Sequence, residues 1–184
     1  MLCDPDLPSL QQYSVQVLLD PDTANPMVSV SEDGKQVKWE RIRRLVPRKP
    51  QRFDCVLNVL AKEGFNTNSF DYEVQVKGKT EWNLGIASES INRKGDIRLS
   101  PQNGYWTIWL RKGHEYTANA EPAVVLNLKK QPQNIGCTFT EKLFPFFSPG
   151  ANVDGNNSAP LIITPVIRKQ RYDRWSDDEY DDDV

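Results

Sequence analysis

Short runs of alternating apolar and polar residues, separated by turn-forming residues, dominate this sequence. Clear examples are 13–19 (YSVQVLL), 72–76 (YEVQV), 82–86 (WNLGI) and the hairpin-like stretch 27–39 (MVSVSEDGKQVKW). Successive side chains of a β-strand point to opposite faces, so this alternation predicts strands with one buried face. The sequence has no long helical period, no heptads and no internal repeat. We therefore predict an all-β fold, an antiparallel sandwich or barrel of many short strands.

Other segments extend this prediction along the chain. Asp33-Gly34 suits a tight hairpin turn between two strands. Further strands are expected at 97–99, within 123–130 (AVVLNLKK) and within 160–167 (PLIITPVI), with a turn at 100–104. The segment 53–64 (FDCVLNVLAKEG) fits both a helical stripe and a strand, and its β-branched valines and short length favour a strand.

The stretch 103–112 (NGYWTIWLRK) supplies the best candidate for a binding surface. A period of two places Trp106, Ile108 and Leu110 on one side, which suits a buried sheet face. The opposite side receives Tyr105, Thr107, Trp109 and Arg111, and Asn83 faces outward on its own strand. Aromatic residues and Arg are enriched at protein interfaces. From the spacing alone, Trp109 either packs under another loop or anchors a partner.

The charge distribution argues against nucleic acid as a partner. The chain has 184 residues and a net charge of −2. The stretch 167–184 carries four Lys or Arg and seven Asp or Glu, a net charge of −3, so the rest of the chain is near +1. Nucleic-acid-binding domains are usually strongly basic. The basic stretch 41–52 either contacts phosphates or, as we favour, is a solvated loop, because no aromatic residues interleave its charges.

The sequence predicts a cytoplasmic protein without a membrane partner. No apolar run approaches the roughly 18 residues of a membrane span, and 1–13 is a leader without the pattern of a secretory signal. The cysteines, Cys3, Cys55 and Cys137, are odd in number and widely spaced. They match neither a disulfide framework nor a zinc motif, which indicates a reducing compartment.

The residues give no basis for an enzyme, a metal or a cofactor. His114 is the only histidine and lies in a turn-rich stretch, where a surface position is expected. No nucleophile elbow, phosphate loop or H-E-x-x-H motif is present. Cys55 and Cys137 are interpreted as small buried apolar residues. The acidic stretch 167–184 is interpreted as a disordered tail rather than a cation site.

Several motifs, in order, resemble the PRY–SPRY domain found at the end of many tripartite-motif (TRIM) ubiquitin ligases. They include LLDPDTA, VSEDGKQVKW and EGF in the PRY part, followed by YEVQV, TEWNLGIASESINRKGDIRLSPQNGYWTIWL, LFPFFSPG and APLIITPV in the SPRY part. The resemblance spans 14–166, with PRY at about 14–66 and SPRY at about 67–166. It implies a bent antiparallel β-sandwich of the concanavalin-like or jelly-roll-like kind, which recognises proteins through loops at one face.

The resemblance also implies a function and site residues. In the larger ligases the domain selects the substrate or pathogen component, a RING domain transfers ubiquitin, and many members act in innate immunity. The family's binding face corresponds here to Asn83, Trp109, Arg111 and Ala151. Members with a well-formed pocket often have an acid at the position of Asn83 and aromatics at those of Arg111 and Ala151. Only Trp109 keeps this pattern, so a different partner or a weaker contact is expected.

The sequence departs from the family pattern at three points, which concern how complete the domain and its core are. Asp71 and Tyr72 replace a Tyr-Trp pair, which reduces the expected core. The chain begins shortly before the domain, so ligase activity is not expected to reside in it. Gly136 is followed directly by Cys137, where family members have roughly 20–30 further residues that include two strands.

The short junction at Gly136–Cys137 predicts a sandwich that lacks interior strands. Unpaired buried backbone groups cost about 1–3 kcal/mol each, against a total stability of about 5–15 kcal/mol. We expect a destabilised domain, or one that re-pairs its strands or oligomerises through an exposed sheet edge. A truncated, regulatory or nonfunctional fragment is therefore the alternative to a working recognition module.

Overall fold

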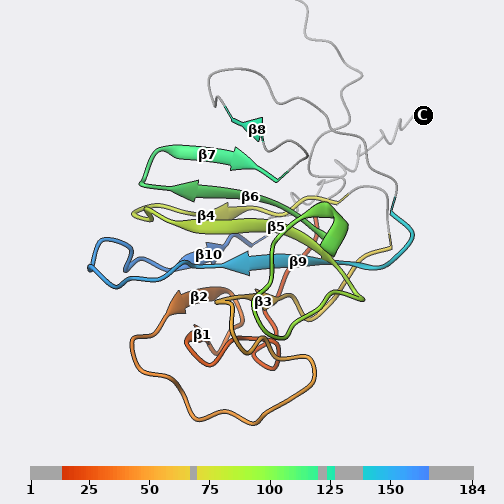
Figure 1. Ribbon diagram of the computed structural model, residues 1–184, viewed down its shortest axis with the longest axis horizontal. Helices are drawn as coiled ribbons and strands as arrows, with labels where there is room; N and C mark the ends of the chain where they lie inside the picture. The colour runs from red at the N-terminus through yellow and green to blue at the C-terminus, as the bar shows by residue number, and fades with distance from the viewer. Residues whose placement is uncertain (1–13, 67–69, 120–123, 127–138, 166–184) are drawn as a thin grey trace, which may run out of the picture.

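The fold is an all-β sandwich of two antiparallel sheets (Figure 1). The computed structural model describes residues 14–66, 70–119, 124–126 and 139–165. A single turn of 3-10 helix, η2 (Pro101–Asn103), is the only helical element in these residues. None of the described segments is a helix that could cross a membrane. The predicted fold class is confirmed.

The smaller sheet has four strands in the order β1-β2-β10-β4. Its strands are short: β1 (Val28–Val30), β2 (Gln36–Trp39), β10 (Leu161–Ile163) and β4 (Val74–Gln75). β1 and β2 form the hairpin that Asp33-Gly34 predicts. Gly34 takes a φ of +69°, a conformation that glycine adopts without steric cost.

The larger sheet has six strands in the order β3-β9-β5-β6-β7-β8. Its central strands are β5 (Trp82–Ser88), β6 (Tyr105–Arg111) and β9 (Leu143–Ser148), and its outer strands are β3 (Val59–Leu60), β7 (Glu115–Ala118) and β8 (Val124–Val125). Trp82 pairs with Leu110, and Ala87 with Tyr105. This register fixes which side chains of β5 and β6 share each face.

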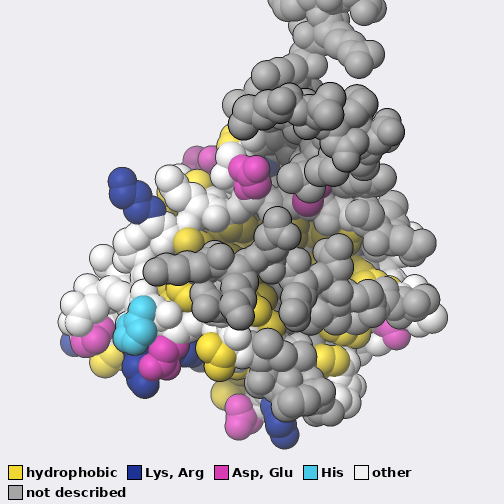
Figure 2. Space-filling model, turned by 90° about the horizontal axis from the view of Figure 1, so that it is seen from above, with side chains coloured by type: hydrophobic (Ala, Val, Ile, Leu, Met, Phe, Trp, Pro, Cys, Tyr) yellow, Lys and Arg dark blue, Asp and Glu magenta, His cyan; other side chains and the backbone are white. Residues whose placement is uncertain are grey.

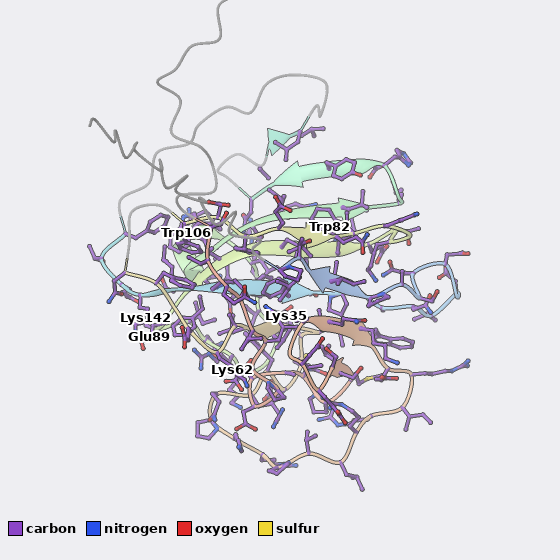
Figure 3. The ribbon with its side chains drawn as sticks, turned by 180° about the vertical axis from the view of Figure 1, so that it is seen from behind. Lys35, Lys62, Trp82, Glu89, Trp106 and Lys142 are labelled. Atoms are coloured by element: carbon purple, nitrogen blue, oxygen red, sulfur yellow. The ribbon has the colours of Figure 1, made fainter. Side chains whose placement is uncertain are left out.

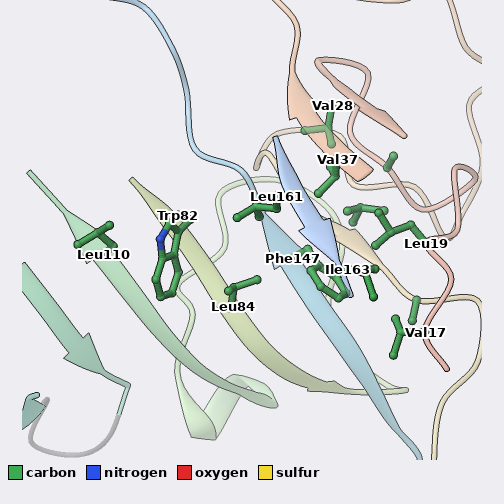
Figure 4. Packing of buried hydrophobic residues seen from close by; sticks show 13 residues of the cluster. Val17, Leu19, Val28, Val37, Trp82, Leu84, Leu110, Phe147, Leu161 and Ile163 are labelled. Carbon is green, nitrogen blue, oxygen red and sulfur yellow. The ribbon is translucent and has the colours of Figure 1, made fainter. Parts of the chain in front are cut away.

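The main hydrophobic core fills the space between the two sheets (Figure 4). From the larger sheet it receives Trp82, Leu84, Leu110 and Phe147, and from the smaller sheet Val28, Val37, Leu161 and Ile163. Tyr72, which stands in place of the family's larger aromatic, packs against Phe147 with ring centroids 5.6 Å apart. Its hydroxyl donates a hydrogen bond to the carbonyl of Gly85, so the smaller ring is still anchored to β5.

A second hydrophobic cluster covers part of the outer face of the six-stranded sheet. It comprises Phe53, Leu60, Ala87, Ile91, Tyr105 and Phe146, with Ile97 and Leu99 packed against it. Tyr105 is 0% exposed, and its hydroxyl donates a 2.7 Å hydrogen bond to the carbonyl of Asn92. The prediction that Tyr105 lies on an exposed binding surface is therefore wrong. The connection between β5 and β6 folds back over this half of the face and buries the ring.

The inward face of β6 is only partly covered. Leu110 is buried, but Ile108 is 41% exposed and Trp106 is half-buried against Phe139, at a centroid distance of 4.9 Å. Trp106 was expected to be fully buried in the core, and the structure shows that it is buried only in part. Figure 3 shows Trp106 and Trp82 toward opposite ends of the sheet, and the covered end is that of Trp82.

Other local predictions have mixed outcomes. In the segment 53–64 only Val59–Leu60 is strand, and 97–99 is loop rather than strand. Strands β7 and β9 were missed because β7 follows a turn-rich stretch and β9 is apolar on both faces. Cys55 is exposed rather than buried. The leader, the acidic tail, Cys137 and the junction with Gly136 lie outside the described residues.

The burial pattern predicts that Tyr105→Ala destabilises the domain more than Trp106→Ala. Removing a fully buried large aromatic ring costs about 3–5 kcal/mol, and a half-buried ring costs less. Chemical denaturation of both variants measures the free energies of unfolding. A larger loss for Trp106→Ala would contradict the assignment of the two faces.

Candidate functional site

A row of side chains crosses the outer face of the six-stranded sheet beyond the second cluster. In register, the row comprises Ser148, Asn83, Trp109, Thr117 and Val125. Ser148 is buried, the next three are half-buried, and Val125 is exposed. Directly paired residues share a face of the sheet, so the indole of Trp109 lies between polar neighbours on an open surface.

Arg111 lies one step along β6 on the same face and is fixed against β5. Its guanidinium donates to Asn83 Oδ1 at 2.6 Å, to the carbonyl of Trp82 at 3.0 Å and to that of Leu110 at 2.7 Å. Burial lowers the pKa of Arg111, and the nearby Glu81 carboxylate opposes that shift. An arginine remains charged in such a setting. Arg111 and Asn83 thus form one pre-positioned polar unit beside Trp109.

Ala151 is held at the same end of the sheet by the buried amide of Asn157. Asn157 is 3% exposed, and its Oδ1 accepts from the backbone N–H groups of Thr80 and Glu81 at 2.9 and 3.2 Å. Its Nδ2 donates to the carbonyls of Glu81, Pro149 and Ala151, each at 3.0 Å. One side chain therefore joins the loop that follows β9 to the start of β5, two residues before Asn83.

Lys79 adds a second tie between these segments. It is buried, and its Nζ donates to the carbonyls of Ala159 and Asn157 at 2.8 and 3.2 Å. Burial lowers the pKa of Lys79 to about 8, and the Glu81 carboxylate opposes that shift. The turn after β6 is bonded to the segment that precedes β5, because the N–H of Gly113 donates to the carbonyl of Thr80.

The structure brings four of the five predicted partner-binding residues together. Asn83, Trp109 and Arg111 share one face, Ala151 lies in the loop tied to it, and Tyr105 is buried elsewhere under the second cluster. Sequence reasoning missed Asn157. The only sequence signal was an Asn among glycines and polar residues in a long loop, which does not indicate a buried amide.

A separate hollow lies at the opposite end of the six-stranded sheet. It has a volume of about 560 Å³, and Ser90, Asp96, Trp106 and Glu141 are among the residues that line it. Of the predicted site residues only Tyr105 borders it. The face around Trp109 lies outside this hollow.

The described residues bring no metal-binding cluster together, and the single histidine lies at the surface. His114 lies at the surface beside charged side chains, and its Nε2 is 3.9 Å from a Glu115 oxygen (Figure 2). No group of three His, Cys, Asp or Glu side chains within the described residues is placed to hold a metal ion.

Comparison with known families identifies the class of domain. Residues 17–65 match the PRY model, described as the SPRY-associated domain, and residues 69–141 match the SPRY domain. The crystal structure of the TRIM65 PSpry domain superposes with a TM-score of 0.66 and 17% identity, over 85% of this chain and 93% of that one. The fold and the two matches define a PRY–SPRY sandwich.

Sequence relatives that match most of this chain include a TRIM protein. Erythroid membrane-associated protein of Mus musculus is 38% identical over 182 residues, covering 85% of this chain and 32% of that protein. E3 ubiquitin-protein ligase TRIM21 of Bos taurus is 35% identical over 184 residues, covering 85% of this chain and 39% of that protein. The chain therefore belongs to the PRY–SPRY family, and it spans less than two fifths of these relatives.

Asn157→Ala is predicted to destabilise the domain and to loosen the loop that carries Ala151. The substitution leaves several backbone groups without their partner, at a cost of at least about 2 kcal/mol. Chemical denaturation gives the stability, and hydrogen exchange at 149–152 reports the loop. Asn156→Ala is the matched control, because that exposed side chain bonds only to Asp154 among the described residues. Equal effects of the two variants would refute the role of Asn157.

The lowered pKa of Lys79 predicts a specific dependence of stability on pH. Unfolded lysine has a pKa of about 10.4, so between about pH 8 and 10 the unfolded chain holds a proton that the folded chain releases. The free energy of unfolding contributed by Lys79 therefore rises across this interval. Denaturation of the wild type and of Lys79→Met at several pH values isolates the effect. If the difference in free energy of unfolding between wild type and Lys79→Met stays constant or falls over this pH interval, the assignment to Lys79 is wrong.

Proposed function

We propose that this domain is a protein-recognition module that binds its partner through the face around Trp109. The observation that carries the proposal is the indole of Trp109, which is only half-buried and is flanked by Asn83 and by an Arg111 that is already fixed in position. Aromatic residues and Arg supply most hot spots of protein interfaces. A side chain that is ordered before binding loses little conformational entropy on association.

The composition of the face supports a partner different from those of relatives with an acidic pocket. Asn83 is neutral and is already engaged by Arg111, so it does not supply the negative charge expected of an acid at that position. Ala151 presents only a methyl group. The partner is therefore expected to contact an apolar indole and a neighbouring guanidinium on a shallow surface. Val125, exposed at the end of the same row, extends the apolar area.

In a longer protein, we propose that the domain selects a substrate for ubiquitination in the cytoplasm, with a role in innate immunity. The support is its relation to bovine TRIM21, which is named an E3 ubiquitin-protein ligase. Ubiquitin transfer itself is assigned to another domain. The chain's own contribution is the choice of partner.

The exposed inward face of β6 favours a second candidate, a regulatory fragment that competes with a complete relative. Ile108 is 41% exposed on the side that faces the second sheet, as expected for a sandwich whose interior is incompletely covered. Pairing through a sheet edge would bury such surface in an oligomer. A thermal melt with sedimentation analysis separates the two functions. A cooperative transition in a monomer supports the recognition module, whereas its absence supports the fragment.

Trp109→Ala is predicted to weaken partner binding at least about tenfold while the domain stays folded, because a central aromatic anchor contributes about 2 kcal/mol or more. Affinity capture with mass spectrometry, comparing wild type and variant, identifies proteins whose recovery depends on the indole. Titration of the purified partner then gives the change in Kd.

The control for this experiment is Ile108→Ala, which removes an exposed apolar side chain from the opposite face of the same strand. It should leave partner binding unchanged. If Ile108→Ala abolishes binding and Trp109→Ala does not, the partner binds the inward face and the proposed site is wrong.

A further inference from the structure

The loop that joins β2 to β3 combines strong positive charge with exposed aliphatic side chains. Residues 41–52 contain six Lys or Arg and no Asp or Glu. Within them, Ile42 is 81% exposed and Leu45 is fully exposed. Single exposed aliphatic residues are ordinary on protein surfaces. Here, however, two exposed aliphatic residues lie three positions apart within a cluster of cations, which is unusual for a surface loop.

Three of the six cations hold this loop to the body of the domain. The guanidinium of Arg52 is buried and donates to the carbonyls of Ala24, Pro21 and Pro47 at 2.7, 2.8 and 2.9 Å. Arg44 donates to the carbonyl of Val28. Lys49, the third of these cations, forms an ion pair with Asp22.

Lys94 fastens the loop from a separate segment, because its Nζ donates to the carbonyls of Lys49 and Arg52 at 2.9 and 2.7 Å. The loop is thus anchored at several points along its length. Its conformation, and with it the projection of Ile42 and Leu45, is fixed by the fold.

The other three cations, Arg41, Arg43 and Arg48, point to solvent. All three are exposed, and none forms an ion pair with an acidic side chain in the part of the chain that the structure describes. They flank Ile42 and Leu45 along the loop. The loop lies on the opposite side of the molecule from β7 and β8 (Figure 1).

We propose that the loop 41–49 docks the domain on a membrane leaflet rich in anionic phospholipids, with Ile42 and Leu45 inserted among the lipids and Arg41, Arg43 and Arg48 at the headgroups. An anionic bilayer surface attracts each nearby cation and accepts apolar side chains at its acyl boundary. Nucleic acid would use the arginines but not the aliphatic side chains. A protein partner would need acidic groups around a pocket that receives both Ile42 and Leu45.

This contact requires no membrane-spanning segment, and it departs from the sequence-based prediction that membranes are not partners. That prediction considered apolar runs. It did not consider a loop whose two aliphatic residues are separated by arginines and whose exposure depends on the fold. The loop also lies apart from the face around Trp109, so the two contacts are independent.

The test is sedimentation of the full chain with vesicles at physiological ionic strength. Vesicles of phosphatidylcholine alone are compared with vesicles that also contain about 30% phosphatidylserine. We expect sedimentation only with the anionic vesicles. The paired substitutions Ile42→Ser and Leu45→Ser should lower the partition coefficient at least about fivefold, and so should the triple substitution of Arg41, Arg43 and Arg48 by Gln.

Matched controls separate this site from general effects of charge and apolarity. Val153→Ser removes an aliphatic side chain that is 84% exposed in another loop. Substitution of Lys62, Lys77 and Arg98 by Gln removes three exposed cations elsewhere. Both controls, and Trp109→Ala, should sediment like the wild type.

Three results would overturn the proposal. The first is failure of the wild type to sediment with anionic vesicles, including the case in which the loop binds the chain's acidic stretch 167–184, an acidic protein or nucleic acid instead. The second is an equal loss in the controls. The third is full binding by the Ile42→Ser, Leu45→Ser variant, which would show that nothing inserts. Because Trp109→Ala is scored separately, these failures are distinct from failure of the proposed protein-recognition face.

Discussion

The antiparallel pairing of β5 with β6 is the interaction on which the rest of the structure depends. Its register places Trp82 opposite Leu110 on the core side and Asn83 opposite Trp109 on the outer side. A slip of one residue would exchange the two sides, moving the core residues to the surface. The approach of the two strands is close at Gly85, where a Cβ atom would lie only 2.1 Å from the carbonyl oxygen of Trp106. Glycine at this position therefore protects the register that creates both the core and the candidate site.

The two ends of the outer face of the six-stranded sheet differ in how they are covered. At one end the connection between β5 and β6 folds back and buries Tyr105 in the second cluster, which stabilises the sheet. At the other end Trp109 is only half-buried, and Asn157 and Arg111 order the surrounding loops and side chains. Stability and the proposed recognition thus depend on different residues of one strand. This division is common in folds that present variable binding surfaces on a rigid scaffold.

Local pattern was sufficient for the fold class, the first hairpin and the facing of Trp82, Leu84 and Asn83, because alternation and turn chemistry act over a few residues. Motif resemblance then supplied the family and four site residues on or beside one face. The position of Tyr105 was not accessible in this way, since its burial depends on a connection that folds back over the sheet. The amide of Asn157 was missed for the same reason: its bonding partners are up to 77 residues away in sequence. β9 was missed because a strand buried on both faces shows no alternation.

The outer face of the six-stranded sheet is closed over Tyr105 and partly exposed at Trp109. Hydroxyl-radical footprinting with mass spectrometry measures this directly, because the oxidation rate of an aromatic side chain follows its contact with water. We expect Trp109 to be oxidised faster than Tyr105. When the partner is bound, the oxidation of Trp109 should slow, and that of Tyr105 should not change. Oxidation of Tyr105 as fast as that of Trp109, or an indole that is equally inert with and without partner, would contradict this expectation.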